Sequence, residues 1–239
     1  MKQYYVLIGN FGSGKTELSL NLAINGAKQG KSILVDLDVI NPYFRSAERK
    51  GDLEAANVKL LHPIFALTTV DVPSLPPDIY SVFVEDYTTV VFDVGGDPAG
   101  ATALGQYKHN FENIGPQEQL EVLYVINPRR PFSATPDMIL DMFEKIEFRS
   151  RLKVTGLVNN GNLASETTAE DLLLGYDVIQ SVSDKTGVPV RFTSARQAVL
   201  DDYLSIASAR GLQPRYIGEP LPITTLMHRD WDRFTELGV

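Results

Sequence analysis

The sequence predicts an α/β fold: a three-layer α/β/α arrangement with a mostly parallel central sheet. Two observations lead to this prediction. First, apolar segments of strand length alternate with helical patterns along the chain, an order typical of parallel sheets covered by helices on both faces. Second, residues 9–16 stand between the first strand pattern and the first helix pattern and match the phosphate-binding loop G-x-x-x-x-G-K-[ST]. We therefore expect a single phosphate-loop NTPase domain over residues 1–239.

The predicted strands are short apolar segments bounded by turn residues. They cover residues 4–8, 32–37, 58–61, 88–92, 121–126, 154–158 and 190–193. Helical patterns cover residues 17–29, 78–84 and 97–110. Gly30 is expected just beyond the end of the first helix, and Asp97-Pro98 and Thr135-Pro136 each place a capping side chain before a proline in the first turn.

Composition narrows the function classes. With 239 residues, 44% of them hydrophobic, the chain is long enough to bury one large core. It contains no cysteine, which excludes disulfides, thiolate metal sites and cysteine nucleophiles. The net charge of −8 argues against nucleic-acid binding through bulk electrostatics. No apolar run approaches membrane-spanning length, so we expect a cytoplasmic protein with neither a membrane nor a nucleic-acid partner.

The phosphate-binding loop has a physical logic. Three glycines let the backbone curl so that its N–H groups point at phosphate oxygens, and the helix behind adds the positive end of its dipole. Lys15 would reach the β and γ phosphates, and the Thr16 hydroxyl would ligate Mg²⁺. The expected nucleotide-binding residues of the loop are Gly9, Asn10, Phe11, Gly12, Ser13, Gly14, Lys15 and Thr16.

Carboxylates follow two further strand patterns. Asp36 and Asp38 end one predicted strand, and Asp93 ends another, three residues before Gly96. Because ligands of open α/β sheets gather at the carboxyl ends of strands, these three carboxylates would converge on one magnesium nucleotide. Asp93 would hold Mg²⁺ directly or through water, and Gly96 leaves room for a backbone N–H to touch the γ-phosphate. The alternative for each carboxylate is an ordinary turn or helix-capping acid.

The order of these motifs resembles the CobQ/CobB/MinD/ParA nucleotide-binding domain of the SIMIBI class of phosphate-loop NTPases. The resemblance covers nearly the whole chain. It rests on residues 9–16, Asp36-Leu37-Asp38, Asp93-Val94-Gly95-Gly96, Leu157-Val158-Asn159-Asn160 and residues 188–195 with the helix that follows. The first of these motifs is highly specific, and the others gain their force from order and spacing.

The resemblance implies roles for individual residues. Asp38 would position the attacking water and Asp36 would help to order Mg²⁺. Lys15 and Asp38 would then be the catalytic residues, and Thr16, Asp36 and Asp93 the metal ligands. The nucleotide base would face Asn159, Asn160, Thr193, Ser194 and Ala195. The asparagine-rich stretch at 159–162 also reads simply as a turn.

The sequence departs from this resemblance at Asn10. Partitioning ATPases of the group carry a signature lysine at this position, contributed across a dimer to the partner's phosphates, and a neutral side chain cannot supply that charge. Arg45 is the candidate substitute, and its alternative is a surface arginine. The doubled pair Arg129-Arg130 reads as a solvated loop and not as a binding patch.

Three functions are compatible with these features. Guanine-binding phosphate-loop proteins usually carry an Asn/Thr-Lys-x-Asp run, which is absent here, so we expect ATP with Mg²⁺. The favoured function is an ATPase that acts as a nucleotide switch or assembly factor, with a protein partner or a homodimer. The alternative is an ATP-dependent, carboxylate-activating ligase resembling dethiobiotin or cobyrinate amide synthetases, with a substrate pocket along residues 95–119. Asn10 favours a third function, a binding module that hydrolyses slowly if at all.

Overall fold

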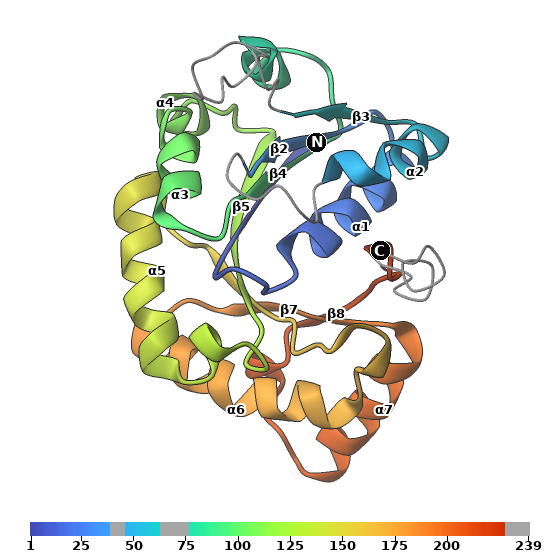
Figure 1. The fold of residues 1–239 in the computed structure, drawn as a ribbon, viewed down its shortest axis with the longest axis vertical. Coiled ribbons are helices and arrows are strands. Elements are labelled where there is room, and N and C mark those ends of the chain that lie inside the picture. The colour runs from blue at the N-terminus through green and yellow to red at the C-terminus, as the bar shows by residue number, and fades with distance from the viewer. Residues whose placement is uncertain (39–45, 63–76, 228–239) are drawn as a thin grey trace, which may run out of the picture.

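The computed structural model describes residues 1–38, 46–62 and 77–227, and the strands within them form one sheet (Figure 1). Every neighbouring pair is parallel, in the order β3-β2-β4-β1-β5-β6-β7-β8. The strands are β1 (Lys2–Ile8), β2 (Ser32–Leu37), β3 (Val58–Leu61), β4 (Thr89–Val94), β5 (Glu118–Ile126), β6 (Gly156–Asn159), β7 (Val190–Ala195) and β8 (Glu219–Pro222).

Helices cover both faces of the sheet, which confirms the predicted three-layer α/β/α architecture (Figure 1). One face is covered by α1 (Lys15–Ala27) and α2 (Lys50–Ala55). The other is covered by α3 (Pro98–Gly105), α4 (Lys108–Glu112), α5 (Pro136–Ser150) and α6 (Ala169–Thr186). The last helix, α7 (Gln197–Ala209), packs on β7, β8 and α6. Short 3₁₀ helices lie at Ser46–Arg49, Pro77–Phe83, Pro131–Ser133, Ala164–Glu166 and Pro214–Tyr216.

The central strands are apolar on both faces because both faces are covered. In β1, Val6 and Ile8 join the apolar cluster under α3 and α5, whereas Leu7 joins the cluster under α1. This double burial explains why the strands read in the sequence as continuous apolar runs. None of the described helices is both long enough and apolar enough to cross a membrane.

Two of the predicted helix starts are confirmed, and one predicted helix end is wrong. The Asp97 side chain accepts the N–H of Gly100 at 2.8 Å, and the Thr135 hydroxyl accepts the N–H of Met138 at 3.4 Å. Gly30, in contrast, does not terminate α1, which ends at Ala27. The N–H of Lys28 closes the last turn onto preceding carbonyls with right-handed backbone angles, so no left-handed residue is needed there.

Two further elements differ from the prediction. Residues 97–110 form α3 and α4 in place of one helix, because the chain turns at Tyr107, whose ring is buried beside Phe83 and Phe92. The strand β8 was not predicted because prolines normally disfavour strands. It pairs with β7 alone among the described strands, and an edge strand tolerates the missing N–H groups.

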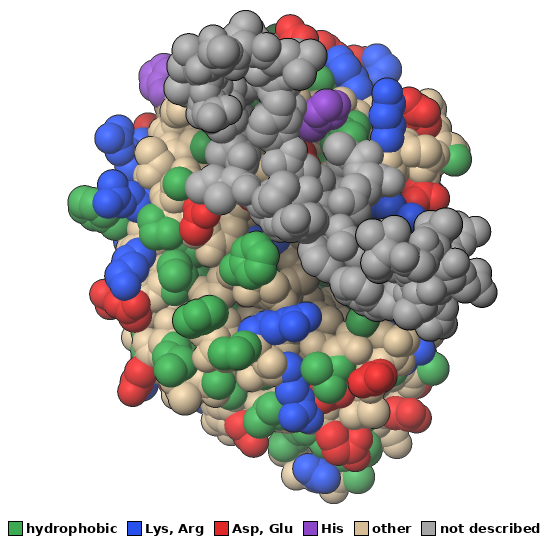
Figure 2. Space-filling model, viewed as in Figure 1, with side chains coloured by type: hydrophobic (Ala, Val, Ile, Leu, Met, Phe, Trp, Pro, Cys, Tyr) green, Lys and Arg blue, Asp and Glu red, His purple; other side chains and the backbone are tan. Residues whose placement is uncertain are grey.

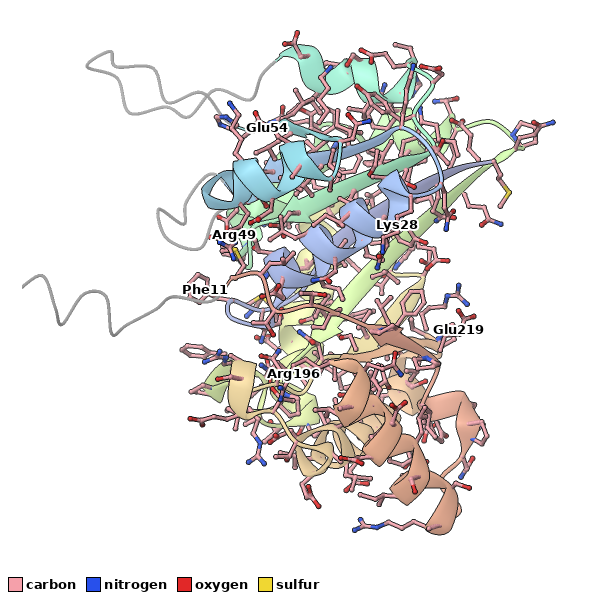
Figure 3. All side chains as sticks on the ribbon, turned by 90° about the vertical axis from the view of Figure 1, so that its right-hand side faces the viewer. Phe11, Lys28, Arg49, Glu54, Arg196 and Glu219 are labelled. Carbon is pink, nitrogen blue, oxygen red and sulfur yellow. The ribbon has the colours of Figure 1, made fainter. Side chains whose placement is uncertain are left out.

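The carboxyl ends of the strands meet at one edge of the sheet. This edge lies on the side of the molecule that is turned to the reader in Figures 1 and 2. Figure 3 shows Phe11 and Arg196, which follow β1 and β7, at this edge, and Lys28 and Glu219 towards the opposite one. Hydrophobic side chains surround a few basic ones on this face in Figure 2. Since β1 lies between β4 and β5, where the strand order reverses, this is where an open α/β sheet binds ligands.

Candidate functional site

The loop between β1 and α1 has the curled backbone that its glycines predict. The φ angles of Gly9, Gly12 and Gly14 are 138°, 74° and 92°, a left-handed region that residues with a Cβ rarely adopt. A Cβ on Gly9 would also lie 2.5 Å from the carbonyl oxygen of Val125 on β5. These positions therefore require glycine both for the turn and for the close approach of the neighbouring strand.

Gly96 lies directly against this loop. A Cβ on Gly96 would lie 2.6 Å from the backbone nitrogen of Phe11 and 2.9 Å from Nζ of Lys15. The segment after β4 therefore touches both the turn of the loop and its lysine. This is the place that the sequence assigned to a backbone contact with the γ-phosphate.

Lys15 is a buried cation surrounded by acids. It is 6% exposed, and its Nζ donates to the carbonyl oxygen of Asn10 at 3.1 Å. Burial lowers the pKa of Lys15, and the charges of Asp93, Asp38 and Asp97 act in the opposite direction. A desolvated ammonium group held in this way is placed to meet a further anion.

Asp93 and Asp36 lie side by side at the ends of β4 and β2 and are both buried. The Ser46 hydroxyl donates to Asp93 Oδ2 at 3.2 Å. Burial raises the pKa of Asp93 to about 6, while the neighbouring Lys15 and the nearby Thr16 hydroxyl act to lower it. The Thr16 hydroxyl backed by one carboxylate is a hard oxygen donor set that fits Mg²⁺, which in nucleotide sites keeps water and phosphate as its other ligands.

The described residues do not gather the three carboxylates into one metal cluster. Within residues 1–38, 46–62 and 77–227, no group of three or more His, Cys, Asp or Glu side chains is arranged to hold a metal ion. Asp36 accepts the N–H of Asp38 through Oδ1 at 2.9 Å. Asp36 and Asp93 are buried, Asp38 lines the cavity, and the charge of Asp38 acts on Asp93. The convergence of the three carboxylates on one magnesium nucleotide stays a prediction.

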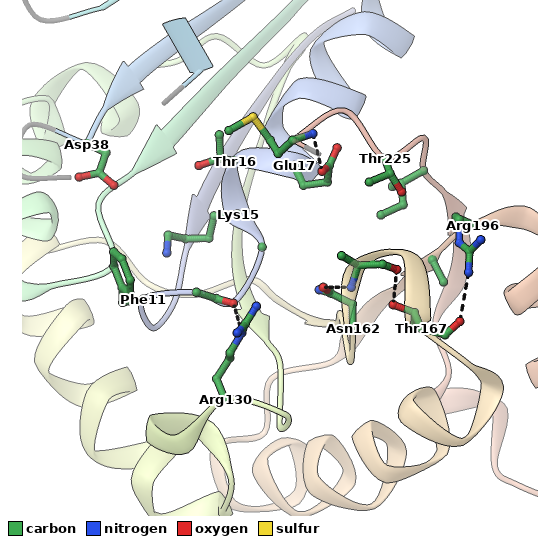
Figure 4. A pocket seen from close by; sticks show the side chains of 16 residues that line it. Phe11, Lys15, Thr16, Glu17, Asp38, Arg130, Asn162, Thr167, Arg196 and Thr225 are labelled. Carbon is green, nitrogen blue, oxygen red and sulfur yellow. Dashed lines mark hydrogen bonds between the residues drawn. The ribbon is translucent and has the colours of Figure 1, made fainter. Parts of the chain in front are cut away.

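A cavity of about 350 Å³ extends from the loop across the carboxyl ends of the strands (Figure 4). The end nearest the loop, called here the phosphate-binding end after the role that the sequence predicts for the loop, contains Lys15, Thr16 and Asp38. The far end is formed by segments after β6, β7 and β8. The lining residues are Phe11, Gly12, Gly14, Lys15, Thr16, Glu17, Asp38, Arg130, Asn162, Ala164, Thr167, Ala195, Arg196, Ile223, Thr225 and Met227.

Of the residues expected to face a nucleotide base, Ala195 lines this cavity. The buried Asn159 side chain donates to the carbonyl of Leu172 at 3.0 Å, underneath α6. Thr193 donates its hydroxyl to the carbonyl of Ile217 at 2.6 Å. The Asn160 side chain accepts the Ser194 hydroxyl at 2.9 Å and donates to the Ser13 carbonyl at 2.7 Å. The structure thus brings Asn160 to the back of the loop, and the side chains of Asn159, Asn160, Thr193 and Ser194 are engaged in hydrogen bonds within the protein.

Several parts of the cavity wall were not assigned from the sequence, among them Arg130, which was interpreted as a solvated loop residue, Arg196 and the segment 223–227. Arg130 donates through Nε to the carbonyl of Gly12 at 3.1 Å, and Arg196 follows β7. The segment 223–227 contributes Ile223, Thr225 and Met227. The position of each arginine just after a strand was a usable signal, because ligands gather at strand ends. No local pattern in residues 223–227 marks them as a wall.

The segment 223–227 is attached to α1 by polar side chains. Glu17 accepts the N–H groups of Leu226 and Met227 at 2.6 and 3.0 Å. Asn21 accepts the N–H of Thr224 at 2.8 Å and donates to its carbonyl at 2.9 Å. Burial raises the pKa of Glu17. The helix that begins with the loop lysine therefore also fixes the far wall of the cavity.

Asn10 does not point into the cavity. It is 2% exposed, its Oδ1 accepts the hydroxyl of Tyr124 at 2.9 Å, and its Nδ2 donates to the carbonyl of Phe132. This side chain ties the loop to β5 and to the segment after it. Arg45, the proposed substitute for a signature lysine, lies outside the described residues.

Comparison with known proteins gives structural matches only. No protein-family model and no curated protein matches the sequence. The cell division protein FtsY of Thermotoga maritima is 16% identical, with a TM-score of 0.53, over 82% of this chain and 62% of its own. FtsY of Mycoplasma mycoides is also 16% identical, with a TM-score of 0.52, over 89% and 69%. The signal recognition particle 54 kDa protein of Aeropyrum pernix, solved with GDP, is 14% identical, with a TM-score of 0.51, over 80% and 41%.

These matches establish the fold and not the family. At such low identity they show the three-layer α/β/α fold of phosphate-loop NTPases alone, and they do not single out the CobQ/CobB/MinD/ParA family. The chain spans about three fifths of the Thermotoga protein and about two fifths of the Aeropyrum protein. The activities and partners of those larger proteins are therefore not carried over to this chain.

Proposed function

We propose that this protein binds a magnesium nucleoside triphosphate, with adenine preferred, hydrolyses it and acts as a nucleotide switch. The carrying observation is the phosphate-binding end of the cavity, where a curled glycine loop, the buried Lys15, the Thr16 hydroxyl and the Asp38 carboxylate meet. Each of these groups has a counterpart in phosphoryl transfer: backbone donors and a cation for phosphate oxygens, a hydroxyl for the metal and a carboxylate for water.

The parts of this mechanism follow from charge and position. The N–H groups at the start of α1 have no partner within the helix and would bind phosphate oxygens. Lys15 would neutralise the β and γ phosphates. Thr16, with Asp93 behind it, would hold Mg²⁺, which neutralises phosphate charge when bound. Asp38 lines the cavity at the end of β2, with its Oδ1 3.2 Å from the position of a Cβ on Gly95, and would orient the attacking water.

The far end of the cavity favours adenine. A guanine-selective site usually presents a carboxylate to the two donors of the guanine edge. Among the described lining residues the carboxylates are Glu17 and Asp38. Both Glu17 oxygens accept backbone N–H groups, and Asp38 lies at the phosphate-binding end. The bound GDP in the Aeropyrum structure makes the choice of base the first property to measure.

Equilibrium titration with ATP and GTP, with and without Mg²⁺, tests the choice of base. We expect ATP to bind at least about tenfold more tightly than GTP, since an unanswered guanine donor edge costs on the order of 1.5 kcal/mol. Binding of both should weaken without Mg²⁺. Tighter binding of GTP would reverse the adenine assignment, and the absence of binding of either at millimolar concentration would refute the proposed function.

The switch part of the proposal is supported by the packing behind Gly96. A Cβ on Gly100 at the start of α3 would lie 2.7 Å from Cα of Gly95. A Cβ on Gly105 at the end of α3 would lie 2.8 Å from the carbonyl of Arg149 in α5. Because these contacts are close-packed, a shift of residues 95–96 towards a γ-phosphate would be transmitted to α3 and from α3 to α5.

Hydrogen exchange with ADP and with a non-hydrolysable ATP analogue tests this coupling. We expect greater protection of residues 94–110 with the ATP analogue, because a ligand shifts a conformational equilibrium only through contacts that differ between states. Light scattering on the same samples reports any change in association state. Equal protection of 94–110 and equal mass in both states would exclude the switch while leaving nucleotide binding intact.

A further inference from the structure

Arg130 occupies a defined position beside the phosphate-binding loop. It lies in the segment after β5, where its backbone N–H donates to the carbonyl of Asn127 at 3.1 Å and its carbonyl accepts the N–H of Ser133 at 2.9 Å. Its side chain crosses to the loop, and Nε donates to the Gly12 carbonyl at 3.1 Å. Figure 4 shows the guanidinium group between the loop and the far wall of the cavity.

This hydrogen bond leaves most of the guanidinium group available. Nε is engaged with Gly12, and within the described part of the chain the two terminal nitrogens have no hydrogen-bond or ion-pair partner. Arginine presents its donors in one rigid plane that matches phosphate oxygens. Because Nε is anchored, the plane is oriented before any ligand arrives.

The charge balance of the phosphate-binding end calls for such a group. Lys15 is influenced by three acids, Asp93, Asp38 and Asp97. A polyphosphate that enters this end brings further negative charge, even with Mg²⁺ bound. The other lining arginine, Arg196, donates through Nη2 to the carbonyls of Ser165 and Thr167 at the far end. Arg130 is thus the described arginine whose free donors lie next to the loop.

Asn10 cannot supply this charge. In the partitioning ATPases that the sequence resembles, the same position carries a lysine. Asn10 is neutral, and both of its polar atoms are engaged with Tyr124 and Phe132. The contact with Phe132 attaches the loop to the same segment that carries Arg130. The bonds of Asn10 therefore help to hold Arg130 against Gly12.

We infer that Arg130 contacts the phosphate chain of the bound nucleotide from outside the loop, through its two terminal nitrogens. This inference rests on the proposed function and assigns its second phosphate-binding cation. The contact comes from the same chain, so nucleotide binding by a single subunit includes it.

The test compares Arg130→Gln and Arg130→Lys with the parent. Glutamine keeps a donor for the Gly12 carbonyl but removes the charge, whereas lysine keeps the charge and loses the planar fork. Arg149→Gln is the matched control, because Arg149 is exposed on α5. Dissociation constants for ATP and ADP are measured by calorimetry at about 0.05 M and about 0.5 M KCl, where the Debye length falls from roughly 14 Å to roughly 4 Å. Melting curves without nucleotide monitor the fold.

We expect Arg130→Gln to weaken ATP and ADP binding about tenfold at low salt, Arg130→Lys to weaken it about threefold, and Arg149→Gln to change it less than twofold. The difference in nucleotide affinity between Arg130→Gln and the parent should be smaller at high salt, since an exposed charge is screened. Binding of Arg130→Gln within twofold of the parent would overturn the inference and leave the proposed function standing. An equal, salt-independent loss in both variants would also overturn it, because it would mean that Arg130 only supports the loop. Failure of the parent to bind nucleotide would refute both.

Discussion

The Lys15→Ala variant is expected to lose most of its affinity for ATP while keeping its fold. Lys15 is the buried cation at the phosphate-binding end of the cavity, and no apolar cluster of the core includes it. Its charge-assisted contacts with two phosphates would contribute about 3 kcal/mol. This corresponds to roughly a hundredfold increase in the dissociation constant, which calorimetry measures directly.

Lys28→Ala is the matched control for this variant. Lys28 is exposed at the opposite end of α1, where its Nζ donates to Asn25 Oδ1 at 2.9 Å. The Lys28→Ala substitution removes the same charge at the other end of the helix, and we expect the ATP affinity to be unchanged within about twofold. A dissociation constant of Lys15→Ala within about threefold of the parent would contradict the assignment of Lys15 to the phosphates. A collapsed melting transition would instead assign it to the fold.

The Asp38→Asn variant is expected to bind ATP normally and to hydrolyse it about a hundredfold more slowly. Asparagine keeps the shape of the side chain but cannot accept a proton or orient water as a carboxylate does, and such groups contribute on the order of 10²-fold or more to a rate. Phosphate release under single-turnover conditions measures the chemical step, and titration measures affinity.

Asp177→Asn provides the control for the loss of a carboxylate, since Asp177 is exposed on α6 away from the cavity. Its turnover should match that of the parent. If Asp38→Asn instead turned over within about twofold of the parent and lost ATP affinity, Asp38 would act on the ground-state nucleotide or its metal, and the hydrolytic role would be wrong.

Local signals account for strands β1 to β7, the loop and the starts of α3 and α5. The turn at residues 9–16 needs glycine at fixed positions, so its sequence predicts its backbone before any packing is known. Asp97 and Thr135 cap their helices through groups only three residues away, a distance that local pattern covers. The apolar strands predict a buried sheet because both of its faces must be covered. These features place Lys15, Thr16 and Asp93 at one edge of the sheet.

Tertiary packing decided what the remaining site residues do. Asn159 was expected near a base, yet α6 packs over it and its side chain donates to the Leu172 carbonyl. Asn10 looked like a missing cation, yet it is a buried link to Tyr124 on β5. In both cases the residue type is compatible with either role, and the direction of the side chain depends on which element covers it.

By itself, the sequence determined the fold class and the curled backbone of the loop at residues 9–16, because apolar periodicity and the positions of glycines are local signals. The tertiary structure alone decided the rest of the cavity. Arg130 reaches Gly12 across 118 residues, and Glu17 holds Leu226 across 209. Such contacts form only where the sheet order brings distant segments together. The end of a strand marks the neighbourhood of Arg130, but no local pattern predicts which distant group Arg130 or Glu17 contacts.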